Sequence, residues 1–244
     1  MKGIMKKAVF LAAAGMTALA LSGCSAGSGG KRIVRISHAQ SETHPEHLGL
    51  LAFKEYVEER LGDKYEVQIF PNELLGSAQK AIELTQTGAI DFVVAGTANL
   101  ETFAGVYEIF SMPYLFDSKA HAYAVLDGEI GQSLFDGLES QGMVGLTYME
   151  NGFRNVFSTK PITKPADLKG VKIRIMENQI QTATFSALNA IVTNMASGEV
   201  YTGLQQGTID AQENPYEVIV SNKLYEQQDY VVETNHLPHL ISLI

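Results

Sequence analysis

The chain has 244 residues, of which 45% are hydrophobic and 18% charged, and it carries a formal net charge of −9. These values are typical of a folded globular protein and exclude a long disordered or low-complexity chain. The acidic balance argues against a basic nucleic-acid-binding surface, and we expect no nucleic acid among the partners. Cys24 is the only cysteine, so this sequence holds neither an intramolecular disulfide nor a cysteine metal cluster.

Residues 1–23 have the pattern of a bacterial lipoprotein signal peptide. Three lysines near the start precede the alanine-rich apolar run 8–20, which is too short to span a bilayer comfortably. The run ends in Leu-Ser-Gly-Cys at 21–24, which resembles a lipobox and implies cleavage before Cys24 and lipid on its sulfur. Residues 24–31 then form the lipidated cysteine and a flexible tether. An ordinary secretory signal with an incidental cysteine is the alternative.

The charge balance limits how this protein attracts an anion. The predicted leader holds three lysines and no acidic residue, so its removal would change the formal charge from −9 to −12. Salt also screens the overall field beyond about 8 Å. An anion-binding site in this protein therefore needs local, fixed positive groups.

After the tether, strand and helix patterns alternate in the manner of an α/β fold. Period-two or buried runs predict strands at 32–37, 65–70, 89–96 and 143–149. Helical runs, several of them closed by glycine, predict helices at 47–61, 77–87, 119–126 and 130–141. The initial β-α-β-α-β order predicts a mainly parallel sheet with right-handed crossovers. We assign residues 32–150 to a first lobe.

A second set of α/β elements begins near residue 151. We expect strands at 154–158, 171–175 and 208–212, and helices at 180–188 and 199–206. Residues 151–238 form the expected second lobe, and residues 239–244 start a return to the first lobe.

Two segments, one in each expected lobe, resemble each other. QTGAID (Gln86–Asp91) and QQGTID (Gln205–Asp210) both follow a helix and lead into a strand. This echo favours two lobes of similar plan. Ligands of such folds lie beyond the carboxyl ends of the strands, often between domains.

The strand at 171–175 carries the first candidate binding residue. Val171, Ile173 and Ile175 alternate with Lys172 and Arg174, which is the period of a strand. The pattern fits a solvated outer face, since charged residues are mostly exposed. It also fits an arginine that points into a cleft and holds an anion, and the spacing leaves both interpretations open.

The segment Asn-Pro-Tyr-Glu at 214–217 is typical of a capping box. Asn214 would be the N-cap, Pro215 the first helical residue and Glu217 the reciprocal acid. A helix N-terminus also attracts anions, and the Asn214 amide has hydrogens to donate to a ligand.

No motif points to catalysis or to a resident cofactor. The sequence contains no Walker loop, GxGxxG, GxSxG or HExxH. His44 and His47 have an H-x-x-H spacing that a metal could use, but Pro45 and Glu46 favour the start of a helix instead, with Glu46 complementing the dipole. We expect no metal site and no enzyme.

Several segments together resemble the solute-binding proteins of TRAP (tripartite ATP-independent periplasmic) transporters, and the resemblance extends from Arg32 to His236. The segments are Leu74–Phe92, Met112–Phe116, Pro161–Arg174 and Gly198–Pro215. The resemblance implies a two-lobed α/β fold of the periplasmic-binding-protein type, with a ligand cleft between the lobes.

The resemblance also implies how an organic anion is held. The family's strand arginine, which makes a bidentate salt bridge to the ligand carboxylate, matches Arg174. Its second arginine matches Arg154, and the asparagine of its QENP motif matches Asn214. A planar guanidinium fixes a carboxylate through two parallel hydrogen bonds.

Five further residues match positions near the ligand or differ from the family pattern there. His38 and Gln40 follow the first strand, where His38 could instead close a turn. Glu73 and Glu150 could accept hydrogen bonds from sugar hydroxyls or be solvated surface. Ser197 stands where many relatives have an aromatic wall, which leaves room for a more polar ligand such as a sugar acid.

The resemblance implies an extracytoplasmic, lipid-anchored monomer that captures a sugar acid or dicarboxylate. It would deliver the ligand to small and large TRAP membrane subunits driven by an ion gradient. An ABC-type binding protein, a sensing lipoprotein and an extracytoplasmic enzyme acting on a carboxylate are the alternatives. Relatives continue beyond the position of Ile244, so we expect a C-terminally truncated fold, with the apolar run 240–244 starting the returning strand of an incomplete first-lobe sheet and an unpaired apolar edge.

Overall fold

The computed structural model describes residues 30–244, so the predicted leader and Cys24 lie outside the described residues. One mixed sheet contains all the strands of the described region. These strands are β1 (Arg32–His38), β2 (Tyr65–Phe70), β3 (Phe92–Gly96), β4 (Thr147–Ser158), β5 (Lys172–Ile175), β6 (Ile191–Asn194), β7 (Ala211–Asn214) and β8 (Tyr230–Leu243).

The helices connect these strands and pack against the sheet. The α-helices are α2 (Pro45–Leu61), α3 (Ala78–Gln86), α4 (Thr97–Leu100), α5 (Lys119–Leu126), α6 (Glu129–Glu139), α7 (Gln179–Ala187), α8 (Val200–Gln205) and α9 (Tyr216–Ser221). Short 3-10 helices are η1 (Gly105–Ser111), η2 (Pro165–Leu168), η3 (Ser197–Glu199) and η4 (Leu224–Glu226). Most predicted elements are confirmed, usually within three residues at each end.

The sheet has the strand order β2-β1-β3-β8-β4-β7-β5-β6. The β1–β3, β5–β6 and β5–β7 pairs are parallel, as the β-α-β pattern predicts. The pairs β3–β8, β4–β8 and β4–β7 are antiparallel. The expectation of a mainly parallel sheet is therefore wrong at its centre, because two long strands enter it in the opposite sense.

Strand β4 corrects a second expectation. The sequence predicts two strands, 143–149 and 154–158, but the chain forms one strand across the expected lobe boundary at 150/151. Gly152 has a φ of 86°, and the register of β4 with β8 shifts between Glu150 and Phe153. This bulge accommodates the Asn-Gly pair that resembles a turn in the sequence.

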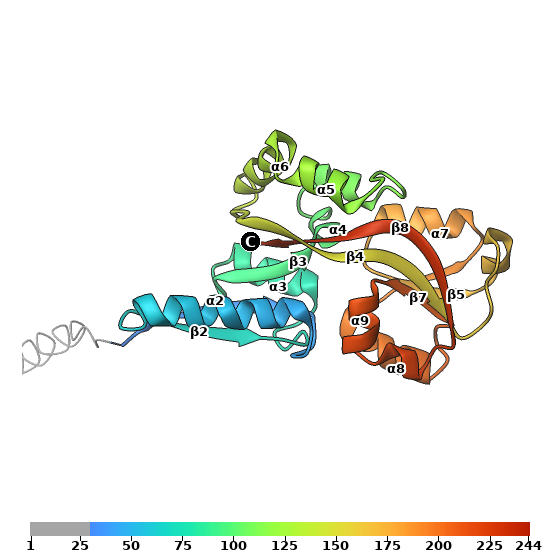
Figure 1. The fold of residues 1–244 in the computed structure, drawn as a ribbon, viewed down its shortest axis with the longest axis horizontal. Coiled ribbons are helices and arrows are strands. Elements are labelled where there is room, and N and C mark those ends of the chain that lie inside the picture. The colour runs from blue at the N-terminus through green and yellow to red at the C-terminus, as the bar shows by residue number, and fades with distance from the viewer. Residues whose placement is uncertain (1–29) are drawn as a thin grey trace, which may run out of the picture. The chain divides into compact units, whose positions relative to one another are not determined.

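Strand β8 lies beside β4 along its length (Figure 1) and completes the centre of the sheet. Its last residues pair with β3 on the other side, with Val94 opposite Leu243 and Gly96 opposite Ile241. The apolar run 240–244 lies at the end of this strand, whose last residue is Leu243. It is paired on both sides, so the expectation that it leaves an unpaired apolar edge is wrong.

Alternation along the long strands builds separate cores on the two faces of the sheet. In β8, Leu240 packs into the core with Tyr107 and Phe135, and its neighbour Ile241 packs into the core with Ile36. In β4, Val156 and Phe157 divide in the same way between two other cores, one around Ile173 and Phe185, the other around Leu204 and Ile219. The first two cores define a first lobe and the other two a second lobe, with β4 and β8 joining them.

The echo between the two lobes has a structural counterpart. Gly88 and Gly207 both have positive φ, 71° and 67°, at the end of a helix. Asp91 Oδ2 then accepts a hydrogen bond from the backbone N of Arg35 at 2.9 Å, and Asp210 Oδ2 accepts one from that of Lys172 at 3.1 Å. Each aspartate thus ties the start of its strand to the strand beside it, and the two lobes share this part of their plan.

The predicted capping box at 214–217 does not form. Asn214 is the last residue of β7, where it pairs with Asn155 of β4, and Pro215 is the N-cap of α9. Pairing with the neighbouring strand keeps Asn214 extended. The side chain is thereby free of the capping role that the local sequence favours.

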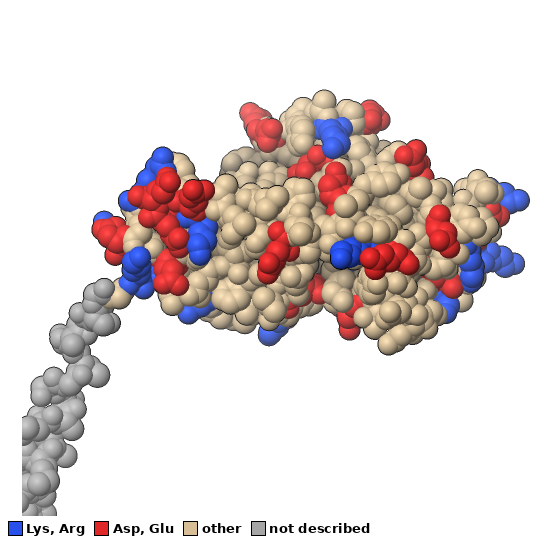
Figure 2. All heavy atoms as spheres, turned by 60° about the horizontal axis from the view of Figure 1, so that its bottom comes forward, with Lys and Arg blue, Asp and Glu red and all other residues tan. Residues whose placement is uncertain are grey.

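Charges are dispersed over the surface of the described region. On the face in Figure 2, acidic and basic side chains are interspersed, with wide areas of other residues between them. Among residues 30–244, no helix is both long and apolar enough to cross a membrane. A local group is still required to hold an anion.

Candidate functional site

A small polar cavity lies between the two lobes, with a volume of about 50 Å³. Its walls come from the carboxyl ends of strands in both lobes and from the loops that follow them, which is where α/β folds bind ligands. The polar lining side chains are Gln40, Glu46, Glu73, Gln79, Asn99, Arg174, Glu177, Ser197, Asn214 and His239. Five of the eight predicted ligand residues are therefore brought together here: Gln40, Glu73, Arg174, Ser197 and Asn214.

A larger cavity of about 510 Å³ lies elsewhere, against α7 and the second-lobe parts of β4 and β8. Its lining is mostly apolar and includes Val156, Leu168, Phe185 and Val232. Such a surface offers few partners for a charged carboxylate, which needs donors when it leaves water. The smaller cavity is the better candidate for an anion site.

Arg174 is the only cation that lines the small cavity among the described residues. It is 3% exposed, and its Nε and Nη2 donate to the backbone oxygen of Met195 at 2.9 and 2.6 Å. These bonds fix the plane of the guanidinium. Within the described region no carboxylate lies within 4.0 Å of it, and no hydrogen bond leaves its Nη1. Burial lowers the pKa of Arg174 to about 10, so it remains charged at neutral pH.

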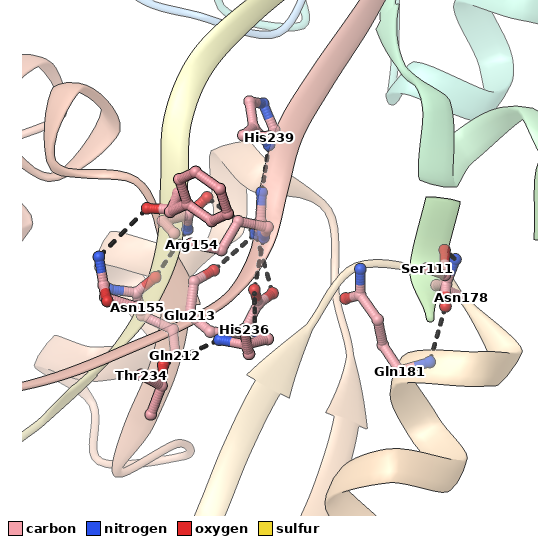
Figure 3. A network of polar contacts seen from close by, with 12 residues as sticks. Ser111, Arg154, Asn155, Asn178, Gln181, Gln212, Glu213, Thr234, His236 and His239 are labelled. Carbon is pink, nitrogen blue, oxygen red and sulfur yellow. Dashed lines mark hydrogen bonds and ion pairs between the residues drawn. The ribbon is translucent and has the colours of Figure 1, made fainter. Parts of the chain in front are cut away.

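Arg154 is placed differently, in a network at the centre of Figure 3. Its Nε and Nη2 donate to the Glu213 carboxylate, and Nη2 also donates to the Glu213 backbone oxygen at 2.6 Å. Burial alone would raise the pKa of Glu213, but Arg154 and His236 outweigh it and lower this pKa to about 2. Arg154 is thus a neutralised, fully engaged cation that does not line the small cavity.

The Arg154 network reaches the cavity through two side chains that do line it. Arg154 Nη2 donates to Asn214 Oδ1 at 3.1 Å, and Nη1 donates to Nδ1 of His239. Accepting at Nδ1 assigns the proton of the His239 ring to Nε2. Burial, followed by the charge of Arg154, holds the pKa of His239 well below its usual value. Arg154 therefore orients one amide and one neutral imidazole at the cavity wall.

Glu73 connects the two lobes across the cavity. It follows β2 with a φ of 55°, and its Oε2 accepts a hydrogen bond from the backbone N of Gly198 at 2.8 Å. Burial raises the pKa of Glu73, while the bonds from Gly198 and Ser197 and the charge of Arg174 act against this rise. The carboxyl group is close to the first turn of η3 and beside the place where an anion would bind.

His38 and Glu46 form a buried polar chain behind the first-lobe wall. Gln40 N donates to His38 Nδ1 at 3.2 Å, so His38 carries its proton on Nε2 and donates to His47 Nδ1 at 3.0 Å. The Glu46 carboxyl lies 3.4 Å from His38 Nδ1. Burial raises the pKa of Glu46 to about 8 and lowers that of His38 to about 4, which favours the neutral form of both side chains.

The surroundings of His44 and Glu46 test two expectations from the sequence, the helix start at this segment and the role of Glu46 in it. His44 is the N-cap of α2, Pro45 is in its first turn, and no metal-binding group of His, Cys, Asp and Glu occurs in residues 30–244. The helix-start interpretation is confirmed. Glu46 lies in the first turn of α2, as predicted, but burial raises its pKa and so disfavours the anionic form that would complement the helix dipole.

Glu150 lies away from the cavity. Its carboxylate accepts hydrogen bonds from Tyr123 Oη at 3.0 Å and from Gly152 N, and it pairs with Lys119 Nζ at 3.1 Å. These contacts tie α5 to the bulge of β4. The structure brings neither Glu150 nor His38 into the cavity lining, and their predicted ligand role has no direct contact to support it.

A second polar contact joins the lobes at the N-terminus of α7, to the right in Figure 3. Asn178 caps this helix by accepting from Gln181 N at 2.8 Å. Its Nδ2 donates to Ser111 Oγ at 2.7 Å and to the backbone oxygen of Ala98 at 3.2 Å, both in the first lobe. Together with Glu73, this contact fixes the described arrangement of the two lobes.

The sequence reasoning missed five polar residues at the cavity: Glu46, Gln79, Asn99, Glu177 and His239. Each belongs to a segment whose local pattern has a simpler interpretation, such as the first turn of a helix. Glu46, Gln79, Asn99 and His239 meet because β1, β3 and β8 are adjacent in the sheet, and Glu177 follows β5 in the second lobe. The position of Asn99 just after a buried strand is the one signal that could have indicated it.

Comparison with known proteins identifies the family of this chain. Residues 36–243 match the family described as bacterial extracellular solute-binding protein, family 7. The 2,3-diketo-L-gulonate-binding periplasmic protein YiaO of Escherichia coli K12 is 36% identical over 91% of this chain. The chain spans 67% of that protein, and 61% of a solute-binding protein from Verminephrobacter eiseniae.

Two solved structures show the same fold with different ligands. A TRAP periplasmic solute-binding protein from Anaerococcus prevotii with bound D-glucuronate is 42% identical, with a TM-score of 0.85. One from Shewanella oneidensis with bound succinate is 32% identical, also with a TM-score of 0.85. They cover 87% and 88% of this chain, which covers 70% of each of them. The chain belongs to family 7 of the bacterial extracellular solute-binding proteins.

Proposed function

We propose that this protein binds a small organic acid, either a sugar acid or a dicarboxylate, in the cavity between its lobes. The observation that carries the proposal is Arg174, a buried guanidinium that lines the cavity and has no carboxylate within 4.0 Å among the described residues. An unpaired buried cation is costly, and a ligand carboxylate would relieve that cost. Relatives that bind D-glucuronate and succinate support this class of ligand.

The geometry supports defined roles for three of the lining side chains, Arg174, Asn214 and His239. Met195 holds one edge of the Arg174 guanidinium, which leaves Nη1 and the remaining Nη2 hydrogen for a carboxylate. Asn214 and His239, oriented by Arg154, supply neutral groups beside it. Arg154 acts as a positioning residue in this proposal, because its donors are already engaged with Glu213, Asn214 and His239.

Ligand entry requires the lobes to separate. A cavity of about 50 Å³ is far below the ~300 Å³ at the lower end of small-molecule sites. Glu73 and Asn178, which bond across the lobes, would release their partners on opening and restore them on closure. We infer that the described arrangement corresponds to a closed form.

The wider role follows from the family and remains a proposal. We propose that the protein acts outside the cytoplasm, anchored by lipid on Cys24, and delivers its ligand to TRAP-type membrane subunits. The lipobox-like sequence at 21–24 supports the anchor, and the relatives named as TRAP solute-binding proteins support the delivery.

A thermal-shift panel of hexuronates, aldonates, dicarboxylates and 2-oxo acids tests the proposal. At a hundred times its dissociation constant, a ligand stabilises the folded state by about 2.7 kcal/mol. For a chain of this size that raises Tm by roughly 5–10 °C. Arg174→Ala should abolish the shift, and Arg60→Ala, which removes an exposed arginine of α2, should retain it. A cooperative melt that none of the acids shifts would contradict the proposal.

A further inference from the structure

The charged groups around the cavity are unequally distributed. Among its described lining residues, one side chain is a guanidinium, Arg174, and three are carboxyls, Glu46, Glu73 and Glu177. The next arginine, Arg154, is already neutralised by Glu213. One ligand carboxylate therefore has a cationic partner, and a second one would have none.

The first-lobe wall offers hydrogen-bonding groups without further positive charge. Gln40 Oε1 and Gln79 Nε2 are buried atoms with no hydrogen-bond partner within the described region. One is an acceptor and the other a donor, and both residues line the cavity. A hydroxyl group both donates and accepts, so it can satisfy either atom, whereas a carboxylate can only accept.

Glu46 adds a third hydrogen-bonding group to the first-lobe wall. It is 8% exposed, lines the cavity and faces the neutral ring of His38 rather than a cation. Burial raises its pKa to about 8, which favours the protonated form that can donate a hydrogen bond as well as accept one. Glu73 differs, since it accepts from Gly198 and lies near the charge of Arg174.

We propose that the cavity selects a polyhydroxylated monocarboxylate over a dicarboxylate, with Arg174 binding the single carboxylate and the first-lobe residues Gln40, Glu46 and Gln79 binding hydroxyls. This inference rests on the proposed function and narrows its ligand class. Like charges placed close together in a site of low dielectric repel strongly. A second ligand carboxylate would approach Glu73 or Glu177 with no cation to offset the repulsion.

Three six-carbon acids provide a matched test: gluconate and glucuronate, each with one carboxylate, and glucarate, with two. Isothermal titration calorimetry at one ionic strength and pH 7.5 should give at least tenfold tighter binding for gluconate or glucuronate than for glucarate. Succinate should bind as weakly as glucarate or more weakly. This comparison uses the unmodified protein, so it does not depend on how any variant folds.

Variants then show which residues of the cavity cause the preference for a monocarboxylate. Glu73→Gln keeps an acceptor but removes the charge, so it should improve glucarate binding several-fold. The ratio between the affinities for gluconate and for glucarate should then become smaller. Glu139→Gln, on the exposed face of α6, is the matched control and should leave the ratio unchanged. Glu46→Gln should retain monocarboxylate binding, because an amide also donates and accepts, while Glu46→Leu should weaken it about tenfold.

The outcomes separate the two proposals. Glucarate or succinate binding as tightly as gluconate and glucuronate, or more tightly, would overturn the selectivity and leave the proposed function in place. A folded protein that binds none of the four acids, nor any acid of the thermal-shift panel, would overturn the proposed function and this inference with it. Selectivity that Glu73→Gln and Glu46→Leu both leave unchanged would also contradict the assignment to this wall.

Discussion

The Glu73 carboxylate and the Gly198 amide form a hydrogen bond of 2.8 Å that joins the first lobe to the second across the candidate ligand cavity. The Gly198 end of the bond lies in η3. The positive charge of Arg174 acts on the same carboxylate and opposes the rise of its pKa. Glu73 is therefore both a wall of the cavity and a contact that holds the lobes in the closed arrangement.

We expect Glu73→Ala to weaken the binding of a monocarboxylate about fivefold. Hydrogen bonds to charged groups contribute roughly 1.5–3 kcal/mol, and partial exposure of Glu73 reduces this toward ~1 kcal/mol. Glu73→Gln keeps a carbonyl acceptor for Gly198 and should lose less. Calorimetric titration measures both effects, and equal affinity in the wild-type protein and the alanine variant would rule out the lobe-joining role.

The two arginines should differ in their effect on stability. Arg154→Met leaves the buried Glu213 carboxylate with only the His236 ring, at 3.3 Å, as a partner, which costs about 3–5 kcal/mol of unfolding free energy. Arg174→Met leaves no carboxylate without its partner, so it should lower the free energy of unfolding clearly less. The double variant Arg154→Met/Glu213→Leu should recover at least half of the loss. Urea unfolding gives all four values, and a similar loss for the two single arginine variants would disprove this distinction.

The pH dependence of stability should carry a contribution from Glu46. Its pKa is about 8 in the folded protein, against the ordinary value of 4.5 that applies once the chain unfolds. The folded state then binds the proton more tightly, so this contribution is fully present below pH 4.5 and is lost as the pH rises to about 8.

Glu46→Gln should remove that dependence, since an amide does not titrate. Above pH 8 the variant should be more stable than the wild-type protein, by roughly a few kcal/mol given 1.36 kcal/mol per pKa unit. Glu139→Gln is again the control. Unfolding in urea at pH 5, 7 and 9 measures the effect, and parallel pH profiles for Glu46→Gln and the wild-type protein would show that Glu46 titrates normally.

Ser197 should control the size of the ligand that fits. It lines the cavity at the start of η3, where a large side chain would project into a space of about 50 Å³. We expect Ser197→Trp to weaken a six-carbon acid by tenfold or more and a four-carbon acid much less. Ser197→Ala is the matched control that adds no bulk. Unchanged affinity for the six-carbon acid, measured by calorimetry, would place Ser197 outside the binding site.

Much of the fold could be predicted because local patterns decide it. The strand Tyr65–Phe70 and the helix Lys119–Leu126 have the predicted bounds, since Pro71 ends the former and Ser118 caps the latter. The errors lie where tertiary pairing overrides a local signal. Asn214 resembles an N-cap but is held extended by β4, and Gly152 resembles a turn but forms a bulge within it.

The candidate site could also be predicted only in part from the sequence. Arg174 and Asn214 could be named from motifs, because each lies in a segment with a family pattern. The engagement of Arg154 with Glu213 and the neutral state of Glu46 could not, since both depend on burial created by distant strands. A sequence records which residues are charged, whereas the sheet order decides which of these charges remain without a partner.

The continuity of β4 and β8 through both lobes has a mechanical consequence. These two strands are paired and each extends through both lobes. Any change in the angle between the lobes must therefore bend both strands together. Arg154 lies where the register between them shifts, with one irregularity on either side. Bending concentrated at this point would swing Asn214 and His239 relative to Arg174. The backbone amides around Arg154 should then exchange with solvent at a rate that follows opening of the cavity.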